Sequence, residues 1–187
     1  MRVITGGAKG RKLLAPKGLN TRPITAKIKG ALFNVLQMQI KQSHFLDLFA
    51  GSGSVGIEAI SRGAEYVAFV EKDWRAVDII KRNISVCNLK NCYDIYRDDV
   101  FRRIKKFKEN NEEFDIIYLD PPFTVDPIFL KVMTALSDGK IVSKNGIVVI
   151  RSKRDKEMPQ EIGVLGRYKQ KNYSLSALHF YRVIYTS

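Results

Sequence analysis

The tetrapeptide Asp120-Pro121-Pro122-Phe123 combines side chains that could bind and activate an amine. Proline has a fixed φ and no N–H, and it restricts the preceding residue to extended backbone, so this loop is stiff and turns carbonyl oxygens outward. A carboxylate and carbonyl oxygens beside an aromatic ring suit a planar group that carries an NH2, such as a nucleobase. A simple structural turn after a strand is the alternative interpretation of an isolated Pro-Pro pair.

A glycine-rich segment and two acidic positions indicate a cofactor site. Residues 51–56 satisfy the pattern G-x-G-x-x-G, and Glu71 follows at the spacing of a ribose-binding acid. The pattern alone does not distinguish NAD from other adenosyl cofactors. Asp47, four residues before the first glycine, disfavours a pyrophosphate and favours the ammonium of a methionyl group. Helix-entry and strand-end structural roles are the alternatives for these residues.

Alternating strand and helix patterns would position these groups. Helical patterns separate the apolar runs, and this alternation predicts an α/β fold in which helices cover a parallel sheet. Ligands in such folds bind at the carboxyl ends of the strands. The glycine loop follows the first predicted strand, Glu71 ends the second, Asp98 and Asp99 follow the third, and the Pro-Pro loop follows the fourth. The five predicted parallel strands are residues 45–49, 66–70, 93–96, 114–119 and 146–150.

Both ends of the chain depart from this alternation. Residues 2–15 predict a β-hairpin, residues 16–23 a loop, and Thr25 the N-cap of an amphipathic helix. Residues 164–169 and 177–185 predict two further strands without an intervening helix. We therefore expect a mostly parallel seven-stranded sheet with an antiparallel C-terminal edge, preceded by an N-terminal β-hairpin and helix.

Positive charge is concentrated near the N-terminus. The net charge is +13, and residues 1–46 contain nine Lys or Arg and no acid. Such a one-sided segment is typical of a polyanion binder, although a solvated basic face is the alternative. We expect residues 1–42 to form a basic extension and residues 43–187 to form the catalytic domain.

The composition limits the remaining possibilities. With 187 residues, 45% hydrophobic and 27% charged, the chain is of ordinary globular composition. No apolar run approaches a membrane span, and the N-terminus lacks the apolar core of a signal peptide, so we expect a cytoplasmic protein. Cys87 and Cys92 lack metal or disulfide-framework spacing, and there are two histidines, so no metal site is expected.

Residues 47–53, followed by Glu71, Asp99 and residues 120–123, resemble class I S-adenosylmethionine-dependent methyltransferases that methylate exocyclic amines. Further motifs narrow this resemblance to the RsmD-type 16S rRNA guanine-N2 methyltransferases. These motifs are Arg2-Val3-Ile4-Thr5-Gly6-Gly7, Gly10-Arg11-Lys12-Leu13, Arg22-Pro23-Ile24-Thr25 and Leu32-Phe33-Asn34. The resemblance covers nearly the whole chain, but it fails at Ala26, Lys29 and Gly30, where the family has Asp or Ser and, later, Arg-Glu.

The resemblance implies a Rossmann-like class I methyltransferase fold and S-adenosyl-L-methionine as cofactor, with S-adenosyl-L-homocysteine as product. It implies a substrate in 16S rRNA, presented within a small-subunit assembly particle. We expect the protein to be a monomer. Asp98 is the weaker alternative to Asp99 for the adenine contact. The implied catalytic residues are Asp120, Pro121, Pro122 and Phe123. The implied cofactor contacts are Asp47, Phe49, Gly51, Gly53, Glu71, Asp99, Val100 and Thr25, and the implied RNA contacts are Arg2, Lys9, Arg11, Lys12 and Arg22.

Two other functions use the same features. A DNA amine methyltransferase shares the Pro-Pro loop, but it commonly needs a separate target-recognition region, for which 187 residues leave little room. A non-enzymatic, basic Rossmann-like RNA binder would use the same loop only as a structural turn.

Overall fold

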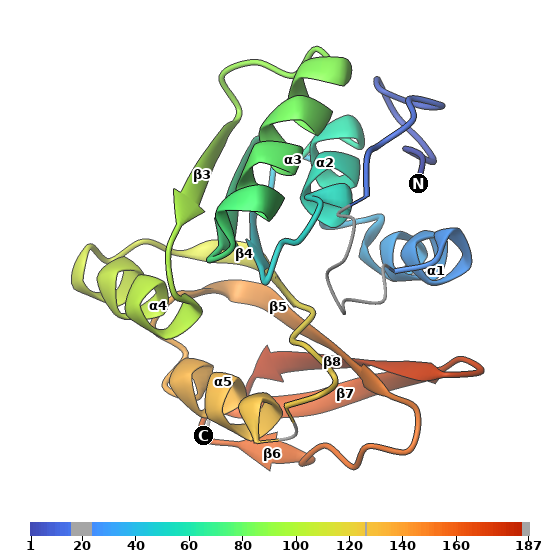
Figure 1. The fold of residues 1–187 in the computed structure, drawn as a ribbon. Helices are drawn as coiled ribbons and strands as arrows, with labels where there is room; N and C mark the ends of the chain where they lie inside the picture. Colours follow the sequence, from blue (N-terminus) through green and yellow to red (C-terminus); the bar gives the residue numbers. More distant parts are fainter. Residues whose placement is uncertain (16–23, 126, 185–187) are drawn as a thin grey trace.

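One mixed sheet organises the protein, and it carries the predicted ligand-binding edge (Figure 1). The computed structural model describes residues 1–15, 24–125 and 127–184. Within them the strand order is β3-β2-β1-β4-β5-β8-β7-β6, with β1 to β5 parallel and β8, β7 and β6 antiparallel at the C-terminal edge. The strands are β1 (His44–Leu48), β2 (Tyr66–Glu71), β3 (Tyr93–Arg97), β4 (Phe114–Leu119), β5 (Val142–Lys153), β6 (Glu161–Ile162), β7 (Leu165–Asn172) and β8 (Ser176–Val183).

The expected α/β architecture with an antiparallel C-terminal edge is confirmed, but the described sheet has eight strands and not seven. The additional strand is the two-residue β6, which is too short to produce a period-two pattern. It turns back onto β7 through Gly163, whose φ is +56°. The last predicted strand, residues 177–185, extends at residue 185 beyond the described part of the chain.

Five helices cover the two faces of the sheet in the described residues, and two apolar clusters fill the space between them. Successive residues of a parallel strand enter opposite clusters: Phe45 packs with α1, α2 and α3, and Leu46 packs with α4 and α5. Strands buried on both faces read as continuous apolar runs, which explains why the sequence pattern predicts them. The helices are α1 (Ala26–Leu36), α2 (Ser54–Ser61), α3 (Trp74–Val86), α4 (Val100–Glu109) and α5 (Ile128–Leu136).

The N-terminal segment follows the path of the predicted hairpin but pairs through a single antiparallel bridge, Arg2 to Lys12. Val3, Ala8 and Leu13 are buried in the same apolar cluster as α1 and α2. Its backbone is also held from the body of the protein, because the Glu58 carboxylate accepts the N–H groups of residues 4 and 5 at 2.8 and 3.0 Å. The segment is therefore packed against the sheet domain, and its separation at residue 42 as a functional extension stays a prediction. The predicted loop, residues 16–23, lies outside the described residues.

All three departures from the family pattern lie in α1, and the surroundings of two of them, Lys29 and Gly30, are informative. Lys29 is buried, and its Nζ lies 3.1 Å from Glu58, 2.9 Å from the Arg2 carbonyl and 3.3 Å from the Ser54 carbonyl. It therefore links α1, α2 and the N-terminal segment. At Gly30, an added Cβ would meet only the tip of Ile4 at 4.0 Å, so nothing in the structure explains a glycine there.

The described residues contain neither a membrane-spanning helix nor a cluster of metal ligands. Within residues 1–15, 24–125 and 127–184, none of the helices combines the length and the apolar character needed to cross a bilayer. Over the same ranges, His, Cys, Asp and Glu side chains form no group of three that could hold a metal ion.

Candidate active site

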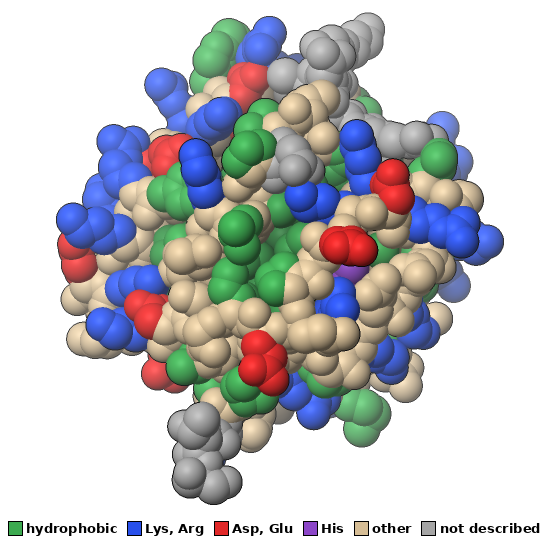
Figure 2. Space-filling model, turned by 90° about the horizontal axis from the view of Figure 1, so that it is seen from below, with side chains coloured by type: hydrophobic (Ala, Val, Ile, Leu, Met, Phe, Trp, Pro, Cys, Tyr) green, Lys and Arg blue, Asp and Glu red, His purple; other side chains and the backbone are tan. Residues whose placement is uncertain are grey.

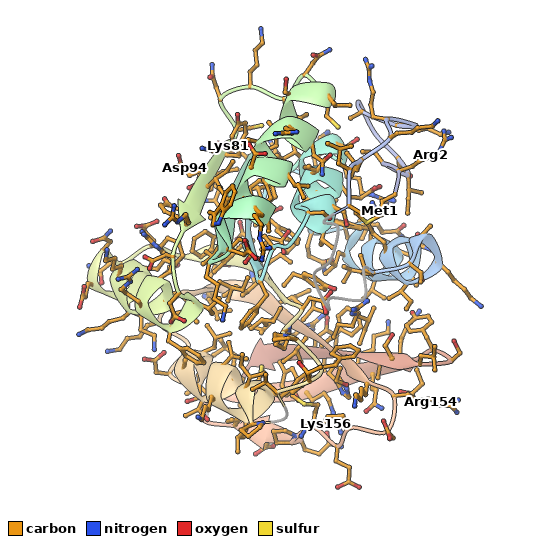
Figure 3. All side chains as sticks on the ribbon, in the orientation of Figure 1. Met1, Arg2, Lys81, Asp94, Arg154 and Lys156 are labelled. Carbon is orange, nitrogen blue, oxygen red and sulfur yellow. The ribbon has the colours of Figure 1, made fainter. Side chains whose placement is uncertain are left out.

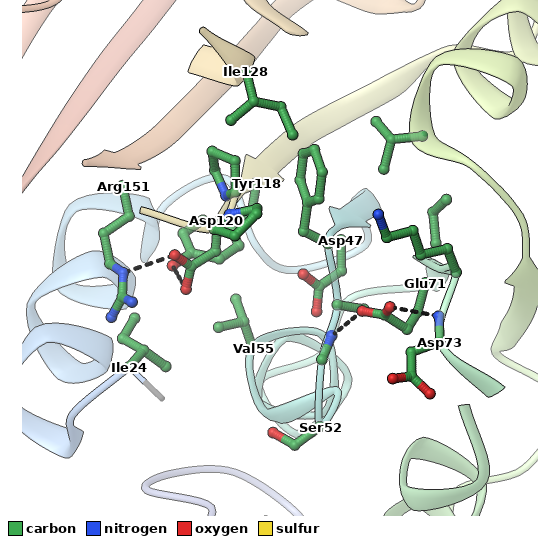
Figure 4. A pocket seen from close by; sticks show the side chains of 18 of the residues that line it. Ile24, Asp47, Ser52, Val55, Glu71, Asp73, Tyr118, Asp120, Ile128 and Arg151 are labelled. Atoms are coloured by element: carbon green, nitrogen blue, oxygen red, sulfur yellow. Dashed lines mark hydrogen bonds and ion pairs between the residues drawn. The ribbon is translucent and has the colours of Figure 1, made fainter. Parts of the chain in front are cut away.

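A cavity of about 330 Å³ lies at the carboxyl ends of the parallel strands (Figure 4). The parallel register brings these strand ends to one edge, with Leu48 opposite both Val70 and Leu119. Residues of the glycine loop, Glu71 at the end of β2, Asp99 after β3 and the Pro-Pro loop all line this cavity. The lining includes Asp47, Phe49, Gly51, Glu71, Asp99, Val100, Tyr118, Asp120, Pro121, Pro122, Phe123 and Arg151.

The turn between β1 and α2 fixes the first acid of the site. Asp47 is buried, and its Oδ2 accepts the N–H of Gly56 at 2.9 Å. Gly53, the N-cap of α2, has a φ of +72°, and an added Cβ there would also lie 3.2 Å from Ile80. Glycine is therefore needed to bring the helix start back toward Asp47. Gly53 is not among the lining residues of the cavity, so its contribution is to the shape of the turn.

Electrostatics make Asp47 a suitable partner for a cation. Burial raises the pKa of Asp47 well above its usual range, and the nearby charges of Asp120 and Glu71 raise the pKa further, whereas the Gly56 N–H lowers it. A cationic ligand group would offset both the burial and the repulsion between carboxylates. An ammonium group, which the sequence predicts at this position, would meet this requirement.

Glu71, the last residue of β2, is held by two backbone groups (Figure 4). Its Oε2 accepts the N–H of Gly51 and its Oε1 accepts the N–H of Asp73, each at 2.9 Å. The carboxylate is thus fixed in orientation before any ligand arrives, and each oxygen keeps a second lone pair for a hydroxyl donor. That arrangement suits a ribose.

The structure separates the two adjacent acids after β3. Asp99 is the N-cap of α4, where its Oδ1 accepts the N–H groups of Phe101 and Arg102, and it lines the cavity. Asp98 is buried, forms ion pairs with Arg102 and Arg103, and is not a lining residue. The geometry favours Asp99 over Asp98 for a ligand contact.

A matched pair of substitutions tests this distinction. Asp99→Asn keeps an N-cap side chain but removes the charge, and it should raise the cofactor Kd about tenfold, the usual effect of one hydrogen bond to a charged group. Asp98→Asn should leave that Kd within about twofold and lower the free energy of unfolding by about 1–2 kcal/mol. Calorimetric titration and urea unfolding measure the two effects. The opposite pattern would move the ligand contact to Asp98.

The pH dependence of the second variant follows from its ion pairs. Burial tends to raise the pKa of Asp98, but hydrogen bonds from Arg102, the Asp99 N–H and Arg103 together lower it. A folded-state pKa below the unfolded value stabilises the protein above the unfolded pKa, and this stabilisation disappears as the pH falls through the folded pKa. The stability difference between wild type and Asp98→Asn should therefore shrink in acid.

The Pro-Pro loop places Asp120 between groups that sequence patterns did not indicate. Arg151 Nε lies 2.9 Å from its Oδ1, and the Tyr118 hydroxyl donates to its Oδ2 at 3.4 Å (Figure 4). Burial raises the pKa of Asp120, while Arg151 and Tyr118 lower it. Tyr118 lies within β4, two residues before Asp120, and Arg151 is reached only through the register that pairs Leu119 with Ile150.

Phe123 also lines the cavity, as does Phe49, whose φ of +61° is uncommon for an aromatic residue. Strained backbone of this kind often occurs at functional sites. The Pro122 carbonyl accepts the Val125 N–H at 3.2 Å and is committed to the turn. The loop therefore presents a carboxylate and an aromatic ring to the same space.

Some predicted site residues lie elsewhere. Thr25 is confirmed as the N-cap of α1, and its hydroxyl oxygen accepts the Ile28 N–H. Among the described residues, however, its neighbour Ile24 lines the cavity and Thr25 does not. Arg22 falls in residues 16–23, outside the described structure. The four remaining predicted RNA contacts are exposed side chains of the N-terminal segment, Arg2, Lys9, Arg11 and Lys12.

Comparisons with known proteins agree with this geometry. The family model "Conserved hypothetical protein 95" matches residues 1–182. "Putative rRNA methyltransferase YlbH" of Bacillus subtilis is 35% identical over 97% of this chain and 98% of its own length. "Ribosomal RNA small subunit methyltransferase D" of Buchnera aphidicola is 36% identical over 81% of this chain and 78% of its own.

The solved structures point the same way. Hypothetical protein TTHA0928 of Thermus thermophilus superposes with a TM-score of 0.84 at 28% identity, over 96% of this chain and 98% of that one. The family model matches almost the whole sequence, and the shared fold covers the same extent. The chain belongs to the Conserved hypothetical protein 95 family, which comprises the RsmD-type methyltransferases.

Proposed function

We propose that this protein transfers a methyl group from S-adenosyl-L-methionine to the exocyclic N2 amine of a guanine in 16S rRNA. The carrying observation is that the Asp120-Pro121-Pro122-Phe123 loop shares one cavity with the acids expected to bind the cofactor. Family membership supports the reaction class, and the names of the relatives, which act on small-subunit rRNA, support the substrate.

The residues present fit the proposed cofactor. Asp47 and the Gly51 backbone would hold the methionine part, Glu71 the ribose hydroxyls, and Asp99 the adenine amine beside Val100. When bound, S-adenosyl-L-methionine supplies an electrophilic methyl group on a sulfonium. Phe49 would contribute apolar surface that excludes water from the site.

The protein must activate the amine that receives the methyl group. The lone pair of an aromatic amine is delocalised into the ring and is a poor nucleophile. In the proposal, the Asp120 carboxylate and the Pro121 carbonyl accept the two N–H bonds and stabilise the positive charge that develops on nitrogen. Phe123 stacks on the base, which leaves its helix or loop to enter the site. Asp120 need not be a strong base, because the nitrogen proton becomes acidic once the methyl group is attached.

In the proposal, the N-terminal segment provides part of the RNA-binding surface. The substrate is rRNA within a small-subunit particle in the cytoplasm, and the protein acts on it as a monomer. Arg2 points away from the body of the protein (Figure 3). Lys and Arg side chains also outnumber acids on the face shown in Figure 2, where hydrophobic side chains gather near the centre. Positive charge is therefore widespread, and a test of the N-terminal contacts needs a matched control.

We expect Lys9→Gln with Lys12→Gln to weaken RNA binding and to reduce the slope of log K against log salt by about 1.5, because each lost phosphate contact removes about 0.7–0.9. The control is Lys105→Gln with Lys106→Gln, which removes the same charge from the exposed side of α4. Filter binding between 50 and 300 mM salt measures both. If the slope of log K against log salt is the same for the two variants, the N-terminal segment does not form part of the RNA interface.

The alternative functions are separated by offering labelled cofactor with small ribosomal subunits, naked 16S rRNA and duplex DNA. We expect label in rRNA and none in DNA. Label only in DNA would support a DNA amine methyltransferase. Protein that binds RNA and cofactor but transfers no label to any substrate would support the non-enzymatic binder.

A further inference from the structure

We infer that Arg151 is a positioning residue that holds both parts of the proposed amine clamp, the Asp120 carboxylate and the Phe123 ring, in their working arrangement. This inference rests on the proposed function, which assigns Asp120 and Phe123 to the target base. Neither motif nor spacing indicated Arg151 at the level of sequence. It lies on β5, 31 residues beyond Asp120.

Backbone pairing explains why Arg151 reaches the loop. Strands β4 and β5 are parallel, with Leu119 opposite Ile150, so the next residues, Asp120 just after β4 and Arg151 within β5, lie side by side. The Arg151 side chain is 5% exposed, and its Nε lies 2.9 Å from Asp120 Oδ1. Figure 4 shows the two side chains pointing toward each other in the lining of the cavity, with Ile24 near the guanidinium.

The same guanidinium reaches the aromatic half of the loop. Its central carbon lies 5.0 Å from the centre of the Phe123 ring, within the range of a cation–π contact. Phe129 lies 6.1 Å from that ring, which is thus supported from a second side. One buried planar cation therefore contacts the two groups that must act on one base, and prior alignment of such groups is a large part of catalysis.

Charge gives Arg151 a second effect. The groups that face Asp120 are Asp47 from β1, Tyr118 from β4 and Arg151 from β5, and Glu71 from β2 faces Asp47. Burial favours a protonated Asp120, whereas Arg151 and the Tyr118 hydroxyl favour the carboxylate. A protonated Asp120 would lose one acceptor for the amine. Arg151 thus supports the ionised form that the reaction requires.

The test begins with Arg151→Met, which preserves side-chain bulk and removes the cation. An opposite charge this close commonly changes the pKa of a carboxylate by about 1–3 units, so the acidic limb of the kcat profile should move to higher pH. We expect kcat to fall about tenfold at pH 6 and less than about threefold at pH 8.5, since the carboxylate is recovered at high pH. Carbon-13 NMR of labelled Asp side chains, with Asp120→Asn for assignment, should show Asp120 titrating at higher pH.

Arg151→Lys separates the two contributions and also serves if Arg151→Met fails to fold. Lysine keeps the charge but lacks the planar guanidinium. Its acidic limb and the Asp120 titration should stay close to those of wild type. KM for RNA should rise about threefold to tenfold, because a compact ammonium cannot pair with Asp120 and also support the Phe123 ring as the planar guanidinium does. Wild-type KM in Arg151→Lys would remove the role toward Phe123.

The matched control is Arg154→Gln, an exposed cation on the turn after β5 (Figure 3). It should change neither the pH profile nor the Asp120 titration. An unchanged acidic limb and an unchanged Asp120 titration in Arg151→Met would overturn the inference. If wild-type protein methylates no RNA, the proposed function fails, but the NMR titration still decides whether Arg151 controls the Asp120 carboxylate.

Discussion

Asp120→Ala is expected to lower kcat for methyl transfer by about 10²–10³-fold, the usual effect of removing one preorganised group that stabilises transition-state charge. The carboxylate lies in the cavity wall beside Phe123, where it would face the amine as positive charge develops. The variant should bind S-adenosyl-L-methionine with a Kd within about threefold of wild type, because the proposed cofactor contacts lie on other strands. Single-turnover transfer and calorimetric titration measure the two quantities.

Two comparisons sharpen this test. Asp78→Ala removes a half-exposed acid of α3 that pairs with Arg82 one helical turn away, and it should leave kcat unchanged. Asp120→Ala should also lose the acidic limb of the pH profile, because the group that titrates there is gone. Transfer by Asp120→Ala at a rate near that of wild type would show that the loop is only a structural turn.

Glu58→Ala is expected to lower the free energy of unfolding by about 3–5 kcal/mol at pH 7, the usual cost of leaving a buried charge without its partner. The Glu58 side chain is 0% exposed and pairs with Lys29 at 3.1 Å and Arg62 at 2.9 Å. It also accepts the backbone N–H groups of residues 4 and 5. Its removal should therefore loosen the N-terminal segment as well as destabilise the fold, and urea unfolding measures the loss.

The effect should depend on pH with a defined sign. Burial lowers the pKa of Lys29, and Glu58 acts in the opposite direction. Without Glu58, the folded-state pKa of Lys29 falls further below its unfolded value, so the unfolded state binds more protons and stability rises with pH up to the unfolded pKa. The deficit of Glu58→Ala should thus be larger at pH 7 than at pH 9.5.

Matched variants separate the buried ion pair from a general loss of negative charge. Glu109→Ala removes a largely exposed acid that lies 3.8 Å from Lys105, and it should cost less than about 1 kcal/mol. Glu58→Ala combined with Lys29→Met should recover part of the loss, since the unpaired cation is removed with its partner. A loss below about 1 kcal/mol for Glu58→Ala would show that the buried pair does not anchor the N-terminal segment.

Much of the fold could be predicted because local physics and tertiary structure agree. The parallel strands are buried on both faces and read as apolar runs, and Thr25 and Asp73 cap the helices α1 and α3. Agreement is weaker at the start of β5 and in the N-terminal segment. β5 begins at Val142, ahead of the predicted residue 146, through a polar stretch that carries no apolar pattern. The N-terminal hairpin pairs by one bridge because packing against α1 and α2 also holds it.

The residues of the candidate site could be predicted where the residue type and its place at a strand end are enough to put the side chain in the cavity. Asp47, Glu71, Asp99 and Asp120 line one cavity because parallel strands end at one edge. Arg151 could not be predicted, since its position depends on the register between β4 and β5, and register is a tertiary property. The choice between Asp98 and Asp99 likewise required the cap geometry of α4, because adjacent residues at a strand end point in different directions.

The identity of the methylated atom tests the central proposal most directly. Small ribosomal subunits that lack the modification would be treated with labelled S-adenosyl-L-methionine and wild-type protein, and the rRNA digested and mapped by mass spectrometry. The account predicts N2-methylguanine at one position of 16S rRNA, and none with Asp120→Ala. Label on adenine or cytosine, or on a ring atom or ribose, would contradict the proposed guanine-N2 methyl transfer.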